Sequence, residues 1–253
     1  MKFTYFGSNS WLVELSGYRI LIDPWFVGDL CFGGQEWLFR GKLTTPLPIP
    51  AQIDLILLSQ GLADHAHEPT LRHLDQSIPV VGSAAAAKVA QRLGFLQVTA
   101  LSPSQIYTLG TPEQGITLQA VPGAPVPQVE NGYVVTNVQT QERIYYEPHG
   151  FFDRSVAQFA PVEVLISPVV DLALPFLGSL IQGYTATPEL VQMLQPKRLL
   201  PTATGGEVEF SGLLLSFLKT QGSLESFQQR LRDQGSETIV TSLAIGESFG
   251  LSP

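Results

Sequence analysis

Residues 53–65 read Ile-Asp-Leu-Ile-Leu-Leu-Ser-Gln-Gly-Leu-Ala-Asp-His. The apolar run predicts a strand over 53–59 that is buried on both faces, as in the parallel part of an α/β sheet. The polar ending places a carboxylate and an imidazole, Asp64 and His65, just beyond the strand. We therefore expect candidate metal ligands at the end of this strand, since both side chains are ligands that divalent metals accept.

The composition favours one large folded domain and excludes several function classes. Hydrophobic residues make up 44% of the 253 residues and charged residues 14%, which predicts a sizeable core. The net charge of −8, without any run of Lys or Arg, argues against nucleic-acid binding. Cys31 is the single cysteine, so no internal disulfide can form and a cytoplasmic location is expected. The most apolar stretch, 164–181, contains Pro168, Asp171 and Pro175, so no membrane span is expected.

Apolar periodicity and turn residues predict the elements along the chain. Strands are expected at 2–6, 10–15, 18–22, 53–59, 79–81, 97–100, 117–121, 132–138, 143–147, 162–167, 197–201 and 238–245. Helices are expected at 69–74, at 84–93 with Ser83 as cap, and at 187–194, 211–219 and 224–234, while 26–50 is expected to be a long loop. Strands followed by strand–helix alternation occur in both halves, which predicts a layered α/β fold with the sheets inside. Without a clear linker, residues 1–253 are expected to form a single domain.

Four segments carry a family resemblance: Tyr5-Phe6-Gly7, Leu21-Ile22-Asp23-Pro24, the Asp64-His65 pair, and Tyr145-Tyr146-Glu147-Pro148-His149-Gly150. They resemble the metallo-β-lactamase superfamily, most closely its lactonase-like branch and a cyanobacterial and plastid-type subgroup of it. The strand Leu199-Leu200-Pro201-Thr202 is similar to the last strand of that family. The resemblance covers almost the whole chain and implies a four-layer αββα sandwich.

The metal motif of that family is degenerate in this chain. The family pattern His-x-His-x-Asp-His falls on Gln60-Gly61-Leu62-Ala63-Asp64-His65, so both leading imidazoles are missing. The family's early histidine is replaced by Ser8, and its later histidines have no counterpart at 121–124 or near Thr202 and Thr204. The resemblance therefore implies that the first metal position is empty.

A second, mononuclear position remains. Asp64 and His65 are its expected ligands, completed by Glu147 or His149 from the later strand end. His67 is a further candidate, as a ligand, a proton donor or a residue that orients a ligand. Asp23 is expected to stabilise its turn and, by the resemblance, to support the metal ligands. Zinc is the first choice, iron or manganese would suit a carboxylate-rich set, and the absence of any metal stays an alternative.

These residues lead to three hypotheses about function. The first is a metal-dependent hydrolase of an ester, a lactone or a similar bond, with Asp64 and His149 as catalytic residues and a small, apolar substrate. The apolar preference rests on Trp25, Phe26, Trp37 and Phe39 and on the segment 172–178, which could wall a pocket or form a homodimer surface. The second hypothesis is a non-catalytic descendant that binds a small apolar ligand or a protein partner. The third is metal-free chemistry with Glu147 and His149 as an acid–base pair.

Overall fold

The computed structural model describes residues 1–45, 47–124, 130–175, 177–203 and 208–251. These residues form two compact units. Unit 1 comprises the described residues of Met1–Leu101, Gly205–Phe217 and Leu243–Pro253, and unit 2 those of Ser102–Thr204 and Leu218–Ser242. The chain thus enters each unit more than once, and the single domain expected for 1–253 stays a prediction.

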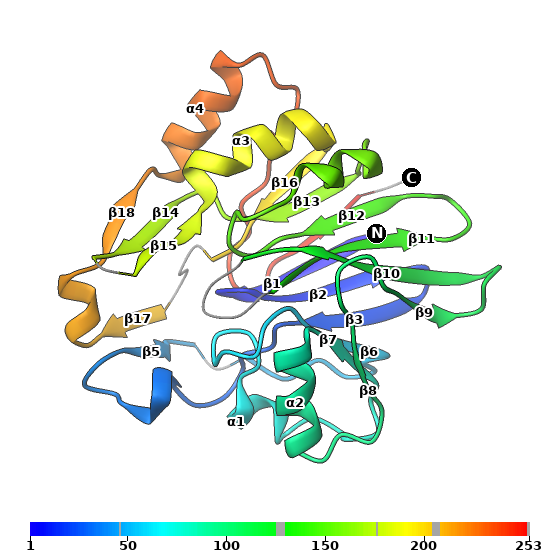
Figure 1. Ribbon diagram of the computed structural model, residues 1–253, viewed down its shortest axis with the longest axis horizontal. Coiled ribbons are helices and arrows are strands. Elements are labelled where there is room, and N and C mark those ends of the chain that lie inside the picture. Colours follow the sequence, from blue (N-terminus) through cyan, green and yellow to red (C-terminus); the bar gives the residue numbers. More distant parts are fainter. Residues whose placement is uncertain (46, 125–129, 176, 204–207, 252–253) are drawn as a thin grey trace. The chain divides into compact units, whose positions relative to one another are not determined.

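A seven-stranded mixed sheet forms the centre of unit 1 (Figure 1). Its strands, in spatial order, are β20 (Ser248–Gly250), β1 (Lys2–Gly7), β2 (Ser10–Leu15), β3 (Tyr18–Ile22), β6 (Leu55–Leu58), β7 (Val80–Gly82) and β8 (Val98–Ala100). The strands from β20 to β3 pair antiparallel and those from β3 to β8 pair parallel. The parallel strands therefore end at one edge, where the residues after β3 and β6 lie next to each other.

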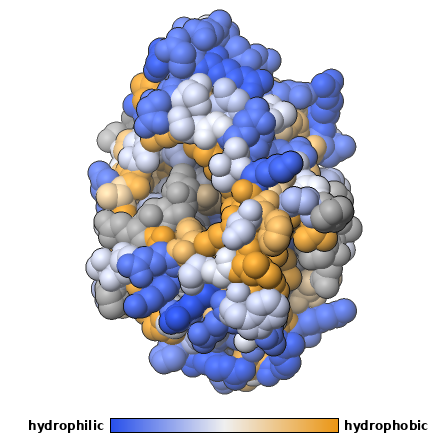
Figure 2. All heavy atoms as spheres, turned by 90° about the vertical axis from the view of Figure 1, so that its left-hand side faces the viewer, coloured by the Kyte–Doolittle hydropathy of each residue, from blue (hydrophilic) through white to orange (hydrophobic). Residues whose placement is uncertain are grey.

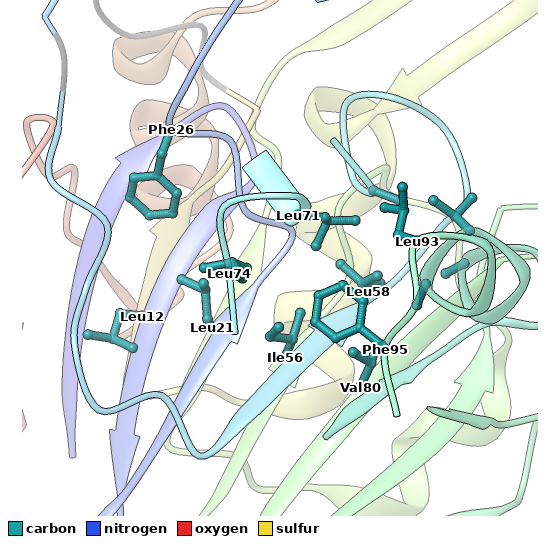
Figure 3. Packing of buried hydrophobic residues seen from close by; sticks show 14 of the residues in the cluster. Leu12, Leu21, Phe26, Ile56, Leu58, Leu71, Leu74, Val80, Leu93 and Phe95 are labelled. Carbon is teal, nitrogen blue, oxygen red and sulfur yellow. The ribbon is translucent and has the colours of Figure 1, made fainter. Parts of the chain in front are cut away.

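Two α-helices, α1 (Glu68–Leu71) and α2 (Ala84–Arg92), belong to unit 1. The hydroxyl of Ser83 accepts a hydrogen bond from the backbone N–H of Ala86, so the predicted cap of α2 is confirmed. Buried side chains of the sheet pack with residues of both helices and of the segments around them, and Figure 3 shows this cluster. Its labelled members are Leu12, Leu21, Phe26, Ile56, Leu58, Leu71, Leu74, Val80, Leu93 and Phe95.

A small three-stranded sheet completes unit 1. It contains β4 (Leu30–Cys31), β5 (Arg40–Leu43) and β17 (Val208–Ser211), with the 3₁₀ helices η1 (Phe32–Gly34) and η3 (Leu213–Ser216) beside them. The segment 26–50, predicted as a long loop, therefore contains two short strands and a 3₁₀ helix. The pairing of β5 with β17 is antiparallel and links residues far apart in the sequence, which local patterns cannot reveal.

Unit 2 is also built on a seven-stranded mixed sheet (Figure 1). The strand order is β19 (Ile239–Val240), β16 (Arg198–Pro201), β13 (Val164–Ser167), β12 (Arg143–Tyr146), β11 (Asn131–Asn137), β10 (Gly115–Pro122) and β9 (Ile106–Gly110). Strands β9 to β12 pair antiparallel and strands β12, β13, β16 and β19 pair parallel. Each unit thus combines an antiparallel half with a parallel half, so β12 takes in unit 2 the place that β3 takes in unit 1.

Helices α3 (Gly183–Leu194) and α4 (Leu224–Asp233) pack on the sheet of unit 2. Leu190 and Leu194 of α3 and Phe227 and Leu231 of α4 are buried at helical spacing, together with Leu165 and Leu199 of the sheet. A short sheet of β15 (Gly178–Gln182), β14 (Asp171–Leu174) and β18 (Lys219–Gln221), and the 3₁₀ helix η2 (Arg154–Phe159), complete the unit. Residues 172–174 and Gly178 of the apolar segment 172–178 therefore belong to the strand pair of β14 and β15.

Two predicted helices differ from the structure for identifiable reasons. A helix at 211–219 is wrong, because Gly212 has a φ of 117° and Leu213 and Leu214 donate backbone hydrogen bonds to Trp37 and Leu38. Helix α3 begins four residues before the predicted start at Thr187, although it contains Pro188. Pro188 cannot donate to the carbonyl of Tyr184, and the guanidinium of Arg230 donates to that carbonyl instead, at 2.8 Å.

Large apolar side chains are exposed on the small sheet of unit 1 and beside it. Trp37, Phe210, Leu213 and Phe217 are 65%, 41%, 49% and 52% exposed. Figure 2 shows apolar residues gathered on the face seen from the left of Figure 1, the side on which β5 and β17 lie. None of the helices that the structure describes combines the length and the apolar character required to cross a membrane.

Candidate functional site

Polar side chains of unit 1 gather where β3 and β6 end. Asp23 follows β3 in a left-handed turn with a φ of 42°, a conformation that aspartate tolerates better than most residues. Ser59 follows β6 directly, and a short turn then leads to Asp64 and His65. Asp23, Ser59 and His65 are fully buried, which is unusual for such polar groups unless they bind one another.

The carboxylate of Asp23 organises this cluster. Its Oδ1 accepts the backbone N–H of Ser59 at 2.8 Å and its Oδ2 accepts the hydroxyl of Ser59 at 2.5 Å. The same Oδ2 lies 2.7 Å from Nδ1 of His65. A carboxylate can only accept, so Nδ1 of His65 carries the hydrogen and Nε2 is the nitrogen available to a metal.

The second nitrogen of His65 is paired with Asp64. Nε2 of His65 lies 3.2 Å from Oδ2 of Asp64. Two ligands of a tetrahedral zinc ion with bonds of about 2.0–2.1 Å are about 3.3 Å apart, so this donor pair has the spacing that a zinc ion requires. Burial alone would lower the pKa of His65, but the charges of Asp64 and Asp23 outweigh it and raise the pKa well above its ordinary value. A metal ion would therefore replace a proton that these two carboxylates now stabilise.

His67 lies apart from this cluster and has a structural partner at each nitrogen. Its Nδ1 lies 3.0 Å from the hydroxyl of Thr70 and accepts the backbone N–H of Thr70 at 3.4 Å, which makes it the cap of α1. Its Nε2 lies 3.2 Å from the carbonyl oxygen of Asp29. Burial lowers the pKa of His67, as expected for a neutral imidazole inside a helix cap.

Gln60 and Leu62 occupy the positions where an imidazole pair would bind a first metal. Gln60 is 3% exposed, and its Oε1 has no hydrogen-bond partner among the described residues. Leu62 offers only an apolar side chain. Together, Gln60 and Leu62 therefore offer one neutral amide and no imidazole nitrogen.

In unit 2 the corresponding polar group follows β12. The carboxylate of Glu147 accepts the backbone N–H groups of His149, at 3.2 and 3.3 Å, and of Gly150. Burial raises the pKa of Glu147 to about 7, although His149 and the two N–H groups act against this. Backbone N–H groups therefore hold the carboxylate of Glu147. The imidazole of His149 lies against a different carboxylate.

That carboxylate belongs to Glu130, which directly precedes β11. Oε2 of Glu130 lies 2.9 Å from Nδ1 of His149, and Glu130 is 1% exposed. Neither Glu130 nor Ser59 is predicted as a site residue from the sequence. A serine at the end of a buried strand could have been noticed, but an acidic residue before a strand is typical of a surface turn and gives no signal.

The structure thus groups the predicted residues as two sets. Asp64 and His65 lie together with Asp23 in unit 1, and Glu147 and His149 lie together in unit 2. Thr202 lies buried after β16, and Val121 and Ala124 lie buried near the end of β10. None of these three side chains is an imidazole. Thr204 lies outside the described residues.

Comparison with known proteins agrees with the fold. Residues 2–203 match the family model described as a beta-lactamase superfamily domain. A search of curated proteins found no significant match to the sequence.

Several solved structures resemble the whole chain. An isothiocyanate hydrolase from Delia radicum gut bacteria has a TM-score of 0.74 at 17% identity, with 100% of this chain and 99% of that chain covered. A possible metal-dependent hydrolase from Veillonella parvula has a TM-score of 0.72 at 16% identity, with 99% of each chain covered. Igni18, a metallo hydrolase from Ignicoccus hospitalis, has a TM-score of 0.68 at 16% identity and the same coverage. At these identities the likeness shows the fold, and it confirms the αββα class predicted from the sequence. Since the family model spans most of the sequence, this chain belongs to the beta-lactamase superfamily and has the metallo-β-lactamase fold.

Proposed function

We propose that this protein is a metal-dependent hydrolase in which Asp64, His65 and His149 bind one divalent metal ion. The three side chains provide one carboxylate and two imidazoles, which are the donors found in three-ligand catalytic sites. The observation that carries the proposal is the arrangement of His65, whose Nδ1 is held by Asp23 while its Nε2 lies 3.2 Å from Oδ2 of Asp64. A pair of donors oriented in this way fits a metal ion.

Each residue would have a defined part in hydrolysis. The metal, when bound, would supply Lewis acidity towards a water molecule and the substrate. Asp64 would bind through one carboxylate oxygen, and its other oxygen could accept a proton from the attacking water. His65 and His149 would act as neutral ligands, with Asp23 fixing the tautomer of His65.

The donor set also limits the number and type of metal ions. Gln60 and Leu62 leave the first metal position of the family without imidazoles, so one ion per chain is expected. Two imidazoles and one carboxylate suit zinc, and the same set accepts iron. We therefore propose zinc, with iron or manganese as alternatives that elemental analysis would identify.

The bond that is hydrolysed is proposed more coarsely, as an ester, a lactone or a similar bond. The similar structures include an isothiocyanate hydrolase, a metallo hydrolase and a possible metal-dependent hydrolase, which supports hydrolysis in general. The apolar substrate predicted from the sequence receives no support from Trp25 and Phe26, which are 1% and 2% exposed and belong to the core. Trp37 and Phe39 remain as candidates for contacts with an apolar substrate.

Elemental analysis of untagged protein, purified without chelator, tests the proposal. We expect about one equivalent of metal in the wild type and less than about a tenth in Asp64→Ala and His149→Ala, because catalytic sites bind their ions tightly. His73→Ala is the matched control, since His73 is exposed and its Nδ1 binds the carbonyl oxygen of Pro69 in α1. A panel of esters and lactones would then be assayed with the same proteins.

The missing imidazoles at Gln60 and Leu62 favour one alternative, a non-catalytic descendant that binds a small ligand or a protein partner. Metal below about a tenth of an equivalent in the wild type, with no turnover of any ester or lactone, would support that alternative. Turnover that persists in EDTA and in Asp64→Ala but is lost in Glu147→Gln would instead support a metal-free acid–base pair of Glu147 and His149.

A further inference from the structure

Each unit contains one buried histidine whose Nδ1 lies against a buried carboxylate. In unit 1 the pair is His65 and Asp23, with 2.7 Å between Nδ1 and Oδ2. In unit 2 it is His149 and Glu130, with 2.9 Å between Nδ1 and Oε2. The two carboxylates come from different places in the topology, one after a strand and the other before one. The shared feature is therefore the chemical arrangement, not a repeated sequence.

Glu130 is held in place by its backbone. Its N–H donates to the carbonyl of Ala124 at 2.9 Å, and its carbonyl accepts the N–H of Gly123 at 3.0 Å. These two hydrogen bonds extend the pairing of β10 with β11 beyond the strand ends. The side chain of Glu130 thus starts from a fixed point beside the segment that carries His149.

The carboxylate of Glu130 has little else to bind. It is almost completely buried, and among the described residues neither oxygen has a well-aligned hydrogen bond, so the close contact with His149 is its main polar contact. A buried carboxylate without a partner is strongly unfavourable. Asp23, by contrast, also binds Ser59 and stabilises its turn. Among the described residues of unit 2, the contact with His149 therefore accounts best for the place of this carboxylate.

We infer that Glu130 is a positioning residue for His149. Its Oε2 lies 2.9 Å from Nδ1 of His149, so the carboxylate favours the tautomer that carries the hydrogen on Nδ1 and presents Nε2 as a metal ligand, and its negative charge makes the imidazole a stronger donor. The inference rests on the proposed function, since it assigns a role toward the same metal ion. Glu147 cannot replace Glu130 in this role, because its oxygens accept the backbone N–H groups of His149 and Gly150.

Metal affinity in the full chain tests the inference. Zinc affinity would be measured by competition with a chromophoric chelator for the wild type, Glu130→Gln and Glu130→Ala. We expect Glu130→Ala to weaken binding about 10- to 100-fold, as is usual when the partner of a metal-bound histidine is removed. Glu130→Gln keeps an acceptor oxygen but loses the charge, so a smaller loss is expected. Because Glu130→Gln keeps the size of the side chain, it carries the test if Glu130→Ala does not fold.

The matched control is Glu163→Gln. Glu163 is a partly buried carboxylate of the same unit that accepts the backbone N–H of Arg143 and contacts Lys197. Glu163→Gln therefore removes a comparable negative charge away from His149. Zinc affinity should stay within about twofold in this variant, in line with contacts that do not orient a ligand. The visible spectrum of the cobalt-substituted proteins provides a second measurement, and only the Glu130 variants should change it.

The outcomes separate this inference from the proposed function. If the wild type binds one metal ion and Glu130→Ala binds it equally well with an unchanged cobalt spectrum, the role of Glu130 is disproved and the proposed function stands. If the wild type binds no metal, the proposed function fails and the inference fails with it. Weaker binding in both Glu130 variants, with Glu163→Gln unchanged, supports the inference.

Discussion

Oδ2 of Asp23 lies 2.7 Å from Nδ1 of His65, and neither side chain is exposed to solvent. Asp23→Asn is expected to weaken metal binding more than tenfold, because the amide oxygen would accept the backbone N–H of Ser59 and the N–H₂ group would then face Nδ1 and move the hydrogen of the imidazole to Nε2. The shape of the side chain is nearly unchanged, so the fold should be retained. Zinc competition titrations measure the effect.

Asp54→Asn provides the control for this substitution. Asp54 lies in the same unit and accepts the backbone N–H of Arg19 at 2.8 Å, in an exposed place away from His65. Equal zinc affinities of Asp23→Asn and Asp54→Asn would contradict the tautomer argument.

The buried carboxyl group of Glu147 predicts a pH dependence of stability in the metal-free protein. Burial raises its pKa from 4.5 to about 7, so folding favours the protonated form. Between these two values the folded state holds a proton that the unfolded state has lost, and the free energy of unfolding falls as the pH rises. Relative to the wild type, Glu147→Gln should gain up to about 3 kcal/mol of stability between pH 4.5 and 7, since glutamine does not ionise.

Urea unfolding in the presence of EDTA at pH 5 and pH 8 measures this difference. Glu113→Gln, which replaces an exposed glutamate of the same unit, should follow the wild type at both pH values. Parallel pH profiles of Glu147→Gln and the wild type would contradict the raised pKa.

His67 is expected to stabilise α1 and not to bind the metal. His67→Ala removes the side chain that accepts the N–H of Thr70, and loss of such a cap typically costs about 1 kcal/mol. Chemical denaturation should show this loss, while the metal content stays at the wild-type value. A variant that folds but lacks metal would show that His67 is a ligand.

Replacing Phe227 or Phe217 by alanine should change the free energy of unfolding by very different amounts. Phe227 is fully buried between α4 and the sheet of unit 2, whereas Phe217 is 52% exposed. Phe227→Ala is expected to cost about 3–5 kcal/mol through lost burial and a cavity. Phe217→Ala should change the free energy of unfolding by less than about 0.5 kcal/mol, as for most surface substitutions. A similar loss in both variants, measured by urea unfolding, would contradict the assignment of the core.

The elements that can be predicted from sequence are those with a strong local pattern. The apolar run that forms β6, the Ser83 cap of α2 and the helical spacing of Phe227 and Leu231 in α4 are all local, and the structure confirms them. The apolar segment 211–219 is ambiguous, because a short apolar run alone does not separate helix from other structure. Its conformation depends on hydrogen bonds to Trp37 and Leu38, far away in the sequence.

In the candidate site, too, residues in a local sequence pattern can be predicted and residues with distant partners cannot. Asp64 and His65 can be recognised because they follow one strand in a family motif. Glu130 cannot, because its partner His149 lies beyond the whole of β11 and β12 in the sequence. The start of α3 is hidden in a similar way, since Arg230 compensates for Pro188 from another helix.

Anomalous X-ray diffraction at the zinc edge, from crystals of the zinc-loaded protein, tests the central claim most directly. The proposal predicts one strong peak at bonding distance, about 2.0–2.2 Å, from a carboxylate oxygen of Asp64 and from Nε2 of both His65 and His149. A zinc peak that does not touch His149, or the absence of any peak beside Asp64 and His65, would contradict it.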